Sequence, residues 1–114
     1  DDCLVCTSGG KGTCYATGVT YEIVCKEWNC KYVGETARSA YSRGLEHLKA
    51  SKTGQEQSVM WKHAREKHGG KIPAYVMDVT GIFGDDAMLR QITESVLIRN
   101  TLGEKLMNTK NEWN

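Results

Sequence analysis

The sequence predicts an α+β domain: a small three-stranded antiparallel sheet flanked by helices. Three short strand-like runs and three helical runs follow one another in the order ββααβα. The 114 residues fit one domain of ordinary size, without repeats or a low-complexity linker. We expect residues 1–18 to form a cysteine-containing extension stabilised by zinc, and residues 19–114 to form the folded domain.

Composition favours a globular chain. Hydrophobic residues make up 39% and charged residues 25%, so a packed core is feasible. We expect no membrane segment, because no apolar run is long enough to cross a bilayer and no signal-peptide pattern is present. The chain begins at Asp1 without Met, which we interpret as a domain excised from a larger protein.

The first two strands form a predicted hairpin. Val19 to Cys25 is the first strand, Lys31 to Gly34 opens the second, and the polar stretch Lys26 to Asn29 gives a four-residue loop. Tyr21 and Tyr32 can then lie close together on adjoining strands. Two tyrosines on a sheet are usually packing residues, so the pair alone says little about function.

The first predicted helix runs from Ala37 to Ala50. Arg43 and His47 lie four residues apart and share one face. Because this face is separate from the apolar stripe, the two side chains are available for chemistry. The stripe expected to face the core is Tyr41, Leu45 and Leu48.

The second predicted helix, Val59 to Lys67, is capped by Ser58 and ends before Gly69 and Gly70. His63 and His68 are five residues apart, which on a continuous helix separates them by about 140°. If the helix unwinds near the glycines, both imidazoles can converge on one ligand.

The third strand, Pro73 to Gly81, is expected to run antiparallel beside the first, so that its start lies near Cys25. The third helix, Ala87 to Asn100, is capped by Asp85 or Asp86. Its expected core stripe is Leu89, Ile92 and Val96. Two tail residues, Leu106 and Trp113, are expected to pack back on the domain.

Glu94 lies on a different face of this third helix from the expected core stripe. Apolar neighbours on that face make a second buried side possible. A helical glutamate is usually solvated, but a partly buried carboxylate needs a partner or a metal.

The five cysteines favour zinc over disulfides, because an odd number cannot close a disulfide set and no secretory signal is present. The preferred site is Cys25, Cys30, His63 and His68. The rival site is Cys3, Cys6, Cys25 and Cys30, and Cys3, Cys6 and Cys14 could otherwise belong to a second site. Either zinc would be structural and would stabilise the hairpin tip.

Charge is distributed unevenly along the chain. The formal net charge is only +1, but the segment from Arg38 to Lys71 carries eight Lys or Arg and three Glu, which leaves +5. A solvated helical surface is the commoner explanation of such a segment. It would also suit a phosphate backbone, and binding would then weaken with salt.

Several of these residues together resemble the GIY-YIG nuclease family. The match spans residues 19–113 and consists of Val19-Thr20-Tyr21, Tyr32-Val33-Gly34, Arg43-x-x-x-His47, a helix with Glu94, and Asn108. The first motif departs from Gly-Ile-Tyr, and Gly18 is displaced by one place. The runs 32–39 and 106–113 are similar to the GIY-YIG domains of Penelope-like and related eukaryotic retroelements.

The resemblance implies roles for six residues in phosphodiester hydrolysis. Glu94 would hold one Mg²⁺ or Mn²⁺, and Arg43 would clamp the scissile phosphate. The general base is Tyr21 or His47, and the residues leave that choice open. Tyr32 would orient water or phosphate, and Asn108 would brace the site, by contact with a tyrosine or with Glu94.

The resemblance therefore implies a metal-dependent DNA endonuclease that nicks DNA in the nucleus. It would be attached to a reverse transcriptase or other modules of a mobile-element protein. The alternative is a non-catalytic, zinc-stabilised DNA-binding or interaction module on the same fold. A thiol redox protein is a more distant third possibility.

Overall fold

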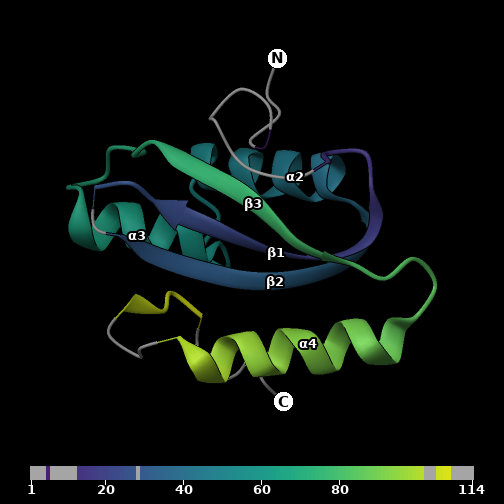
Figure 1. The fold of residues 1–114 in the computed structure, drawn as a ribbon. Coiled ribbons are helices and arrows are strands. Elements are labelled where there is room, and N and C mark those ends of the chain that lie inside the picture. Colours follow the sequence, from purple (N-terminus) through teal and green to yellow (C-terminus); the bar gives the residue numbers. More distant parts are fainter. Residues whose placement is uncertain (1–4, 6–12, 28, 102–104, 109–114) are drawn as a thin grey trace.

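The computed structural model describes Val5 and residues 13–27, 29–101 and 105–108 (Figure 1). These residues form an α+β domain with a three-stranded antiparallel sheet in the order β2-β1-β3, as predicted. Within them, no helix is both long and apolar enough to cross a membrane. The elements are β1 (Thr17–Cys25), β2 (Cys30–Ser39), α2 (Ala40–Lys52), α3 (Val59–Lys67), β3 (Tyr75–Ile82) and α4 (Ala87–Asn100).

The helices cover both faces of the sheet. Tyr21 of β1 is directly opposite Gly34 of β2, so these two residues share a face and Glu35 points to the other. Tyr21 contacts His47 of α2, whereas Glu35 contacts Arg90 of α4. The sheet therefore lies between α2 and α4, as Figure 1 shows.

The central strand β1 supplies much of the core. Its alternate residues Val19, Tyr21, Ile23 and Cys25 are all 0% exposed. Cys25 pairs with Cys30 across the hairpin, which confirms the predicted four-residue loop. The Asn29 amide donates to the Cys25 carbonyl at 2.8 Å and closes the turn.

Several element boundaries differ from the prediction, most clearly the starts of α2 and β3. Residues 37–39 continue β2 instead of starting the helix, because the Ser39 hydroxyl caps α2 by accepting from the Ser42 amide at 3.1 Å. β3 starts at Tyr75 rather than Pro73, at the position where its ladder with β1 ends opposite Cys25. Proline has no N–H to extend that ladder.

The predicted core stripe of α4 is wrong, because Leu89, Ile92 and Val96 are exposed. Arg90 is buried instead and donates to Glu35 at 2.6 Å. A buried charge requires a partner, and this ion pair fixes the helix with its apolar stripe turned outward. Ile98 lies on the inward face and is buried.

The edge of the sheet at β2 is covered by residues 105–108. Leu106 forms a parallel bridge with Lys31, and the Met107 amide donates to the Lys31 carbonyl at 2.7 Å. Asn108 accepts from the Val33 amide at 2.9 Å and donates to the Val33 carbonyl at 2.8 Å. The Asn108 side chain thus bonds both backbone groups of Val33 at the sheet edge, as the backbone of a neighbouring strand would. Trp113 lies outside the described residues.

Replacing Asn108 by Ala should lower the free energy of unfolding by about 1–2 kcal/mol, because both Val33 backbone groups lose their side-chain partner. Urea denaturation would measure the loss. Asn100→Ala at the exposed end of α4 is the control and should leave stability nearly unchanged. Equal losses in the two variants would contradict a specific role for the Asn108 amide.

Candidate active site and metal centre

Tyr21 and His47 meet under the first turns of α2. The Tyr21 hydroxyl lies 2.8 Å from His47 Nε2, and the Tyr32 ring lies with its centroid 5.2 Å from that of His47. The centroids of the two tyrosine rings are 6.3 Å apart, so the sequence-predicted proximity of the tyrosines is confirmed. Three of the predicted catalytic side chains therefore form one cluster.

The protonation states in this cluster are set mainly by burial. Burial, assisted by Tyr32, raises the pKa of Tyr21 well above its usual value, although Arg43 opposes the shift. Burial and the Arg43 charge lower the pKa of His47 to about 3. At neutral pH Tyr21 is therefore a phenol and His47 a neutral imidazole, so the hydroxyl can donate to Nε2.

His47 should make the stability of the domain fall as the pH drops from about 6.5 towards about 3. Its pKa is about 3 in the fold and about 6.5 unfolded, so only the unfolded chain gains a proton as the pH falls through this range. The resulting loss of stability approaches about 1.4 kcal/mol per pH unit.

Denaturation of the parent and of His47→Gln across this range would measure the contribution. We expect the variant to show a shallower slope, because glutamine does not titrate. Identical slopes would show that His47 is not buried as a neutral imidazole.

Gly34 leaves room for the Tyr21 hydroxyl. A Cβ atom at Gly34 would lie 2.5 Å from both Tyr21 Cζ and its hydroxyl oxygen, closer than any non-bonded contact allows. We expect Gly34→Ala to lower the free energy of unfolding by about 1–3 kcal/mol and to displace Tyr21 from His47. Chemical denaturation measures the first effect, and unchanged stability would contradict the close approach.

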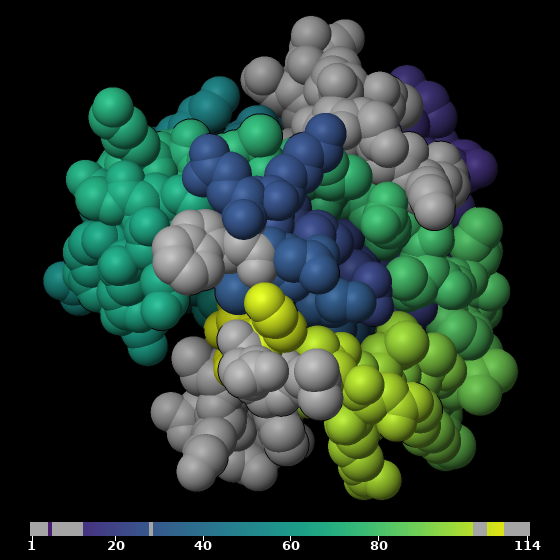
Figure 2. Space-filling view, turned by 60° about the vertical axis from the view of Figure 1, so that its left-hand side comes forward, coloured from purple at the N-terminus to yellow at the C-terminus, as the bar shows by residue number. Residues whose placement is uncertain are grey.

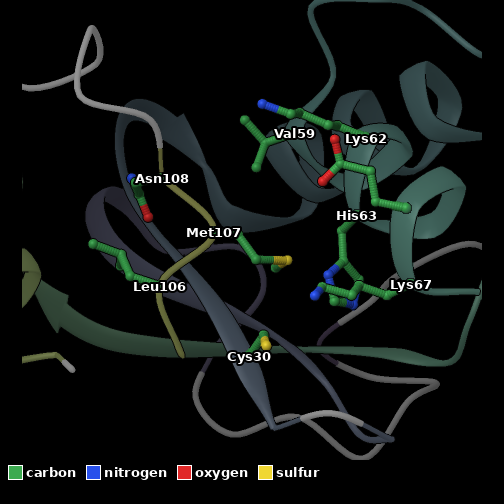
Figure 3. A pocket seen from close by; sticks show the side chains of 9 residues that line it. Cys30, Val59, Lys62, His63, Lys67, Leu106, Met107 and Asn108 are labelled. Atoms are coloured by element: carbon green, nitrogen blue, oxygen red, sulfur yellow. The ribbon is translucent and has the colours of Figure 1, made fainter. Parts of the chain in front are cut away.

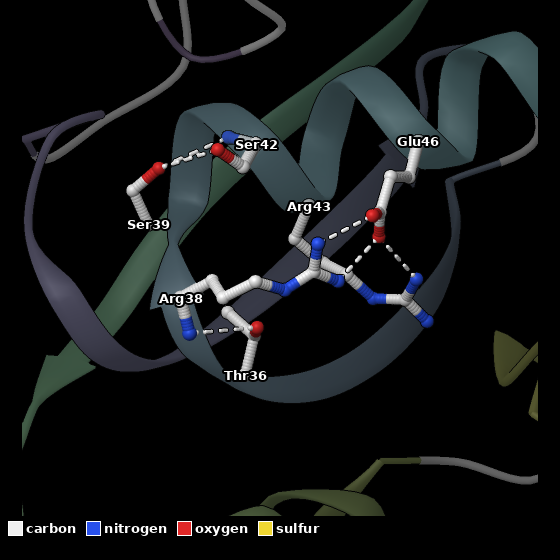
Figure 4. Close-up of polar contacts among 6 residues, drawn as sticks. All are labelled: Thr36, Arg38, Ser39, Ser42, Arg43 and Glu46. Atoms are coloured by element: carbon white, nitrogen blue, oxygen red, sulfur yellow. Dashed lines mark hydrogen bonds and ion pairs between the residues drawn. The ribbon is translucent and has the colours of Figure 1, made fainter.

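Arg43 is positioned by a cluster of charges that the sequence did not reveal (Figure 4). Glu46 accepts from Arg43 at 3.0 Å and from both terminal nitrogens of Arg38. These contacts, those of Arg38 foremost, lower the pKa of Glu46 to about 2. Arg38 and Glu46 lie on different elements, eight residues apart, so no helical spacing indicated that they pair.

Arg43 and His47 face an accessible cavity. It has a volume of about 170 Å³ and lies between α2 and the start of α3. Tyr32, Gln57 and Ser58 also line it. A phosphate group entering this space would meet the Arg43 guanidinium and the His47 imidazole, behind which Tyr21 is buried.

Glu94 and Asn108, the other two predicted catalytic residues, are related to the cluster of Tyr21, Tyr32 and His47 in different ways. The Glu94 charge adds to the raised pKa of Tyr21, after burial and the Tyr32 charge, and Glu94 does not line the cavity. Asn108 holds the backbone of Val33, the residue between Tyr32 and Gly34. It therefore braces the strand that carries the second tyrosine.

A second group of side chains could hold a metal ion. One ligand atom from each of Cys25, His63 and His68 lies within 4.8 Å of the others. His68 Nε2 is 3.3 Å from the Cys25 sulfur and 3.2 Å from His63 Nε2. Thiolate and imidazole ligands converging at this separation suit a tetrahedral ion such as zinc.

The end of α3 brings the two imidazoles together. The helix stops at Lys67, and His68 leaves it with φ −126° before Gly69 at φ +63°. Burial, assisted by His68, lowers the pKa of His63, which favours the neutral form that binds metals. The predicted convergence of the imidazoles by unwinding is confirmed.

Glu27 joins this group as a residue that the sequence analysis missed. Its carboxylate lies 2.8 Å from Nδ1 of His68, while Nε2 faces Cys25. Metal-binding histidines typically use their second nitrogen in this way, which fixes the ring and the tautomer. Its position two residues after Cys25, in the hairpin loop, was the signal available in the sequence.

Of the other cysteines that the structure describes, Cys14 and Cys30 are not part of this group. Cys30 is outside the 4.8 Å group, but it lines a cavity of about 270 Å³ together with His63 (Figure 3). Cys14 is buried in the hydrophobic core. Cys3 and Cys6 lie outside the described residues.

The hairpin, α3 and the 105–108 segment gather on one face of the molecule (Figure 2), and residues of all three line the cavity that contains Cys30 and His63. Comparisons with known protein families, with curated proteins and with solved structures find no match for this chain.

Proposed function

We propose that this chain is a GIY-YIG-type, metal-dependent endonuclease domain that nicks DNA. The observation that carries the proposal is the convergence of Tyr21, Tyr32, Arg43 and His47 beside one accessible cavity, with the Glu94 charge acting on Tyr21. These side chains come from both strands of the hairpin and from α2 and α4. Packing alone does not require a guanidinium, an imidazole and two phenols at one place.

The hydrogen bond between Tyr21 and His47 supports a proton path. Tyr21 is fully buried, so the attacking water must enter from the cavity beside His47; the Tyr21 oxygen then accepts its proton as the Tyr21 hydroxyl proton passes to His47 Nε2. The water oxygen bonds to phosphorus, the bond between phosphorus and the leaving 3′-oxygen breaks, and that oxygen takes a proton from solvent to become a 3′-hydroxyl. In this scheme His47 is the final proton acceptor and Tyr21 relays the proton.

Arg43 supplies positive charge at the cavity. Its guanidinium can donate two parallel hydrogen bonds to phosphate oxygens, which stabilises the charge that develops as the nucleophile attacks. In the free protein Glu46 holds this side chain in place. Glu46 therefore positions Arg43, and its carboxylate also limits how tightly the cavity attracts anions.

Glu94 fits a single magnesium or manganese ion. A half-buried carboxylate is a hard oxygen donor, and such ions keep several waters and phosphate oxygens as their remaining ligands. When bound there, the ion would supply charge stabilisation for the leaving oxygen. We place the other metal, a structural zinc, on Cys25, His63 and His68, with Cys30 as the fourth ligand.

The proposed setting is a mobile-element protein that acts at nuclear DNA and carries a reverse transcriptase or other modules. A nick leaves a free 3′ end that a polymerase can extend. The excess of basic residues between Arg38 and Lys71 supports a nucleic-acid partner, since it attracts phosphates without reading bases.

The experiment that tests the proposal is cleavage of supercoiled plasmid by the zinc-loaded domain. With Mg²⁺ or Mn²⁺ we expect open-circular product, and without added Mg²⁺ or Mn²⁺ we expect none. Omitting the ions is better than adding EDTA, because EDTA would also remove zinc. Arg43→Ala should lower the rate by about 10² to 10³, whereas Arg99→Ala, at an exposed position near the end of α4 and outside the basic segment, should retain it.

Intact plasmid with both ions, from a protein shown to be folded and zinc-loaded, would contradict the nuclease. Retained DNA binding under those conditions would favour the non-catalytic binding module.

A further inference from the structure

The outward face of α4 carries an apolar stripe. Met88, Leu89, Ile92 and Val96 are 73%, 48%, 53% and 45% exposed. They account for four of the six exposed large hydrophobic side chains in the described part of the chain. Isolated exposed apolar residues are normal, but a contiguous set on one helix face indicates a contact surface.

The stripe has a symmetric pattern about Ile92. Met88 lies four residues before it and Val96 four residues after it, while Asp85 lies seven before and Arg99 seven after. Steps of four and seven residues keep Met88, Val96 and Arg99 within about 40° of Ile92 around the helix, and Asp85 lies in the turn that leads into it. A stripe with an acid at one end and a base at the other complements itself when one copy is reversed.

Both terminal charges are exposed. Asp85 lies immediately before the Asp86 cap of the helix, and Arg99 lies in its last turn. Among the residues that the structure describes, neither takes part in an ion pair. Each is therefore available to a partner that approaches the stripe.

We propose that this face binds a second copy of the chain, with the two α4 helices antiparallel about a twofold axis at Ile92. Ile92 then packs on its counterpart, Met88 packs on Val96 of the other copy, and Asp85 meets Arg99 at each end. Such an interface is isologous, because one surface supplies both halves. The charge pattern is what selects a second copy among possible occupants.

The dimer is expected to be weak and reversible. The helix has 14 residues, or about 21 Å, and a single helix pair buries less than the roughly 1,200 Å² of a standard stable interface. Glu94 lies about 160° around α4 from Ile92, so the contact leaves the candidate active site uncovered. The inference does not depend on the proposed nuclease activity.

Sedimentation velocity over a range of protein concentrations would test for the proposed dimer. We expect the parent to show a monomer–dimer equilibrium and Ile92→Asp to weaken it at least about tenfold. Asp85→Arg and Arg99→Asp should each weaken self-association. Glu56→Arg, an exposed charge reversal away from α4, should not.

Mixing the two charge variants gives the decisive result. When one variant pairs with the other, positions 85 and 99 carry opposite charges at both ends of the interface, so heterodimers should form although neither variant pairs with itself. Circular dichroism and metal content would show that each variant is folded. A parent that stays monomeric at every concentration, or a mixture that forms no heterodimer, would overturn the proposal.

Discussion

Glu94→Gln is expected to lower the rate of plasmid nicking by about 10³ or more while leaving the fold and DNA affinity intact. Glutamine keeps the shape of the side chain and its place on α4, so packing is preserved. It removes the negative charge, however, and with it the ligand proposed for the divalent ion. The same charge contributes to the raised pKa of Tyr21, after burial and the Tyr32 charge.

Gln91→Ala, one turn earlier at an exposed position of α4, is the matched control and should cleave at the parental rate. Fluorescence anisotropy with a labelled duplex would establish that both variants bind DNA. Parental cleavage by Glu94→Gln would remove Glu94 from the mechanism. Loss of cleavage together with loss of DNA binding would indicate a misfolded α4 instead, so thermal unfolding is measured for each variant.

Local patterns predicted most of the secondary structure. Hairpin composition gave the loop between Cys25 and Cys30, and the caps Ser58 and Asp86 marked the starts of α3 and α4. These features depend on residues near each other in the chain, where turn and capping chemistry acts directly. The pairing of Tyr21 with His47 was accessible because the hairpin and the next helix are adjacent in sequence.

The errors arose where distant residues decide the structure. The orientation of α4 depends on Arg90 meeting Glu35, which is 55 residues away, and this ion pair outweighed an apolar stripe of helical period. The contact of Asn108 with Val33 spans 75 residues. No local pattern indicates such partners, because each residue alone is typical of a solvated surface.

The candidate metal centre was predicted in part, because some of its residues are indicated by local patterns and others only by contacts between distant residues. Two histidines beside a pair of glycines indicated convergence, and the antiparallel placement of β3 indicated that Cys25 would be near. Glu27 could not be assigned, because a charged residue in a hairpin loop is common. Its contact with Nδ1 of His68 becomes meaningful only once Nε2 is seen to face Cys25.

Cys25→Ser is expected to release the bound metal and to lower the free energy of unfolding by about 4 kcal/mol when zinc is present at roughly a thousand times its dissociation constant. Cys25 is fully buried and its sulfur lies 3.3 Å from His68 Nε2, so a serine oxygen would be a poorer ligand in the same place. Zinc content and the thermal midpoint would measure the two effects, and the midpoint should fall by more than about 10 °C.

Cys14→Ser is a close control, because Cys14 is also a buried cysteine of the core but is not part of the metal group. It should keep its zinc and lose only the stability that burial of a sulfur provides. Chelation should destabilise the parent and Cys14→Ser alike and leave Cys25→Ser unaffected. If both substitutions released zinc equally, the ion would be held in part by the N-terminal cysteines, and the group formed with His63 and His68 would not be the zinc site.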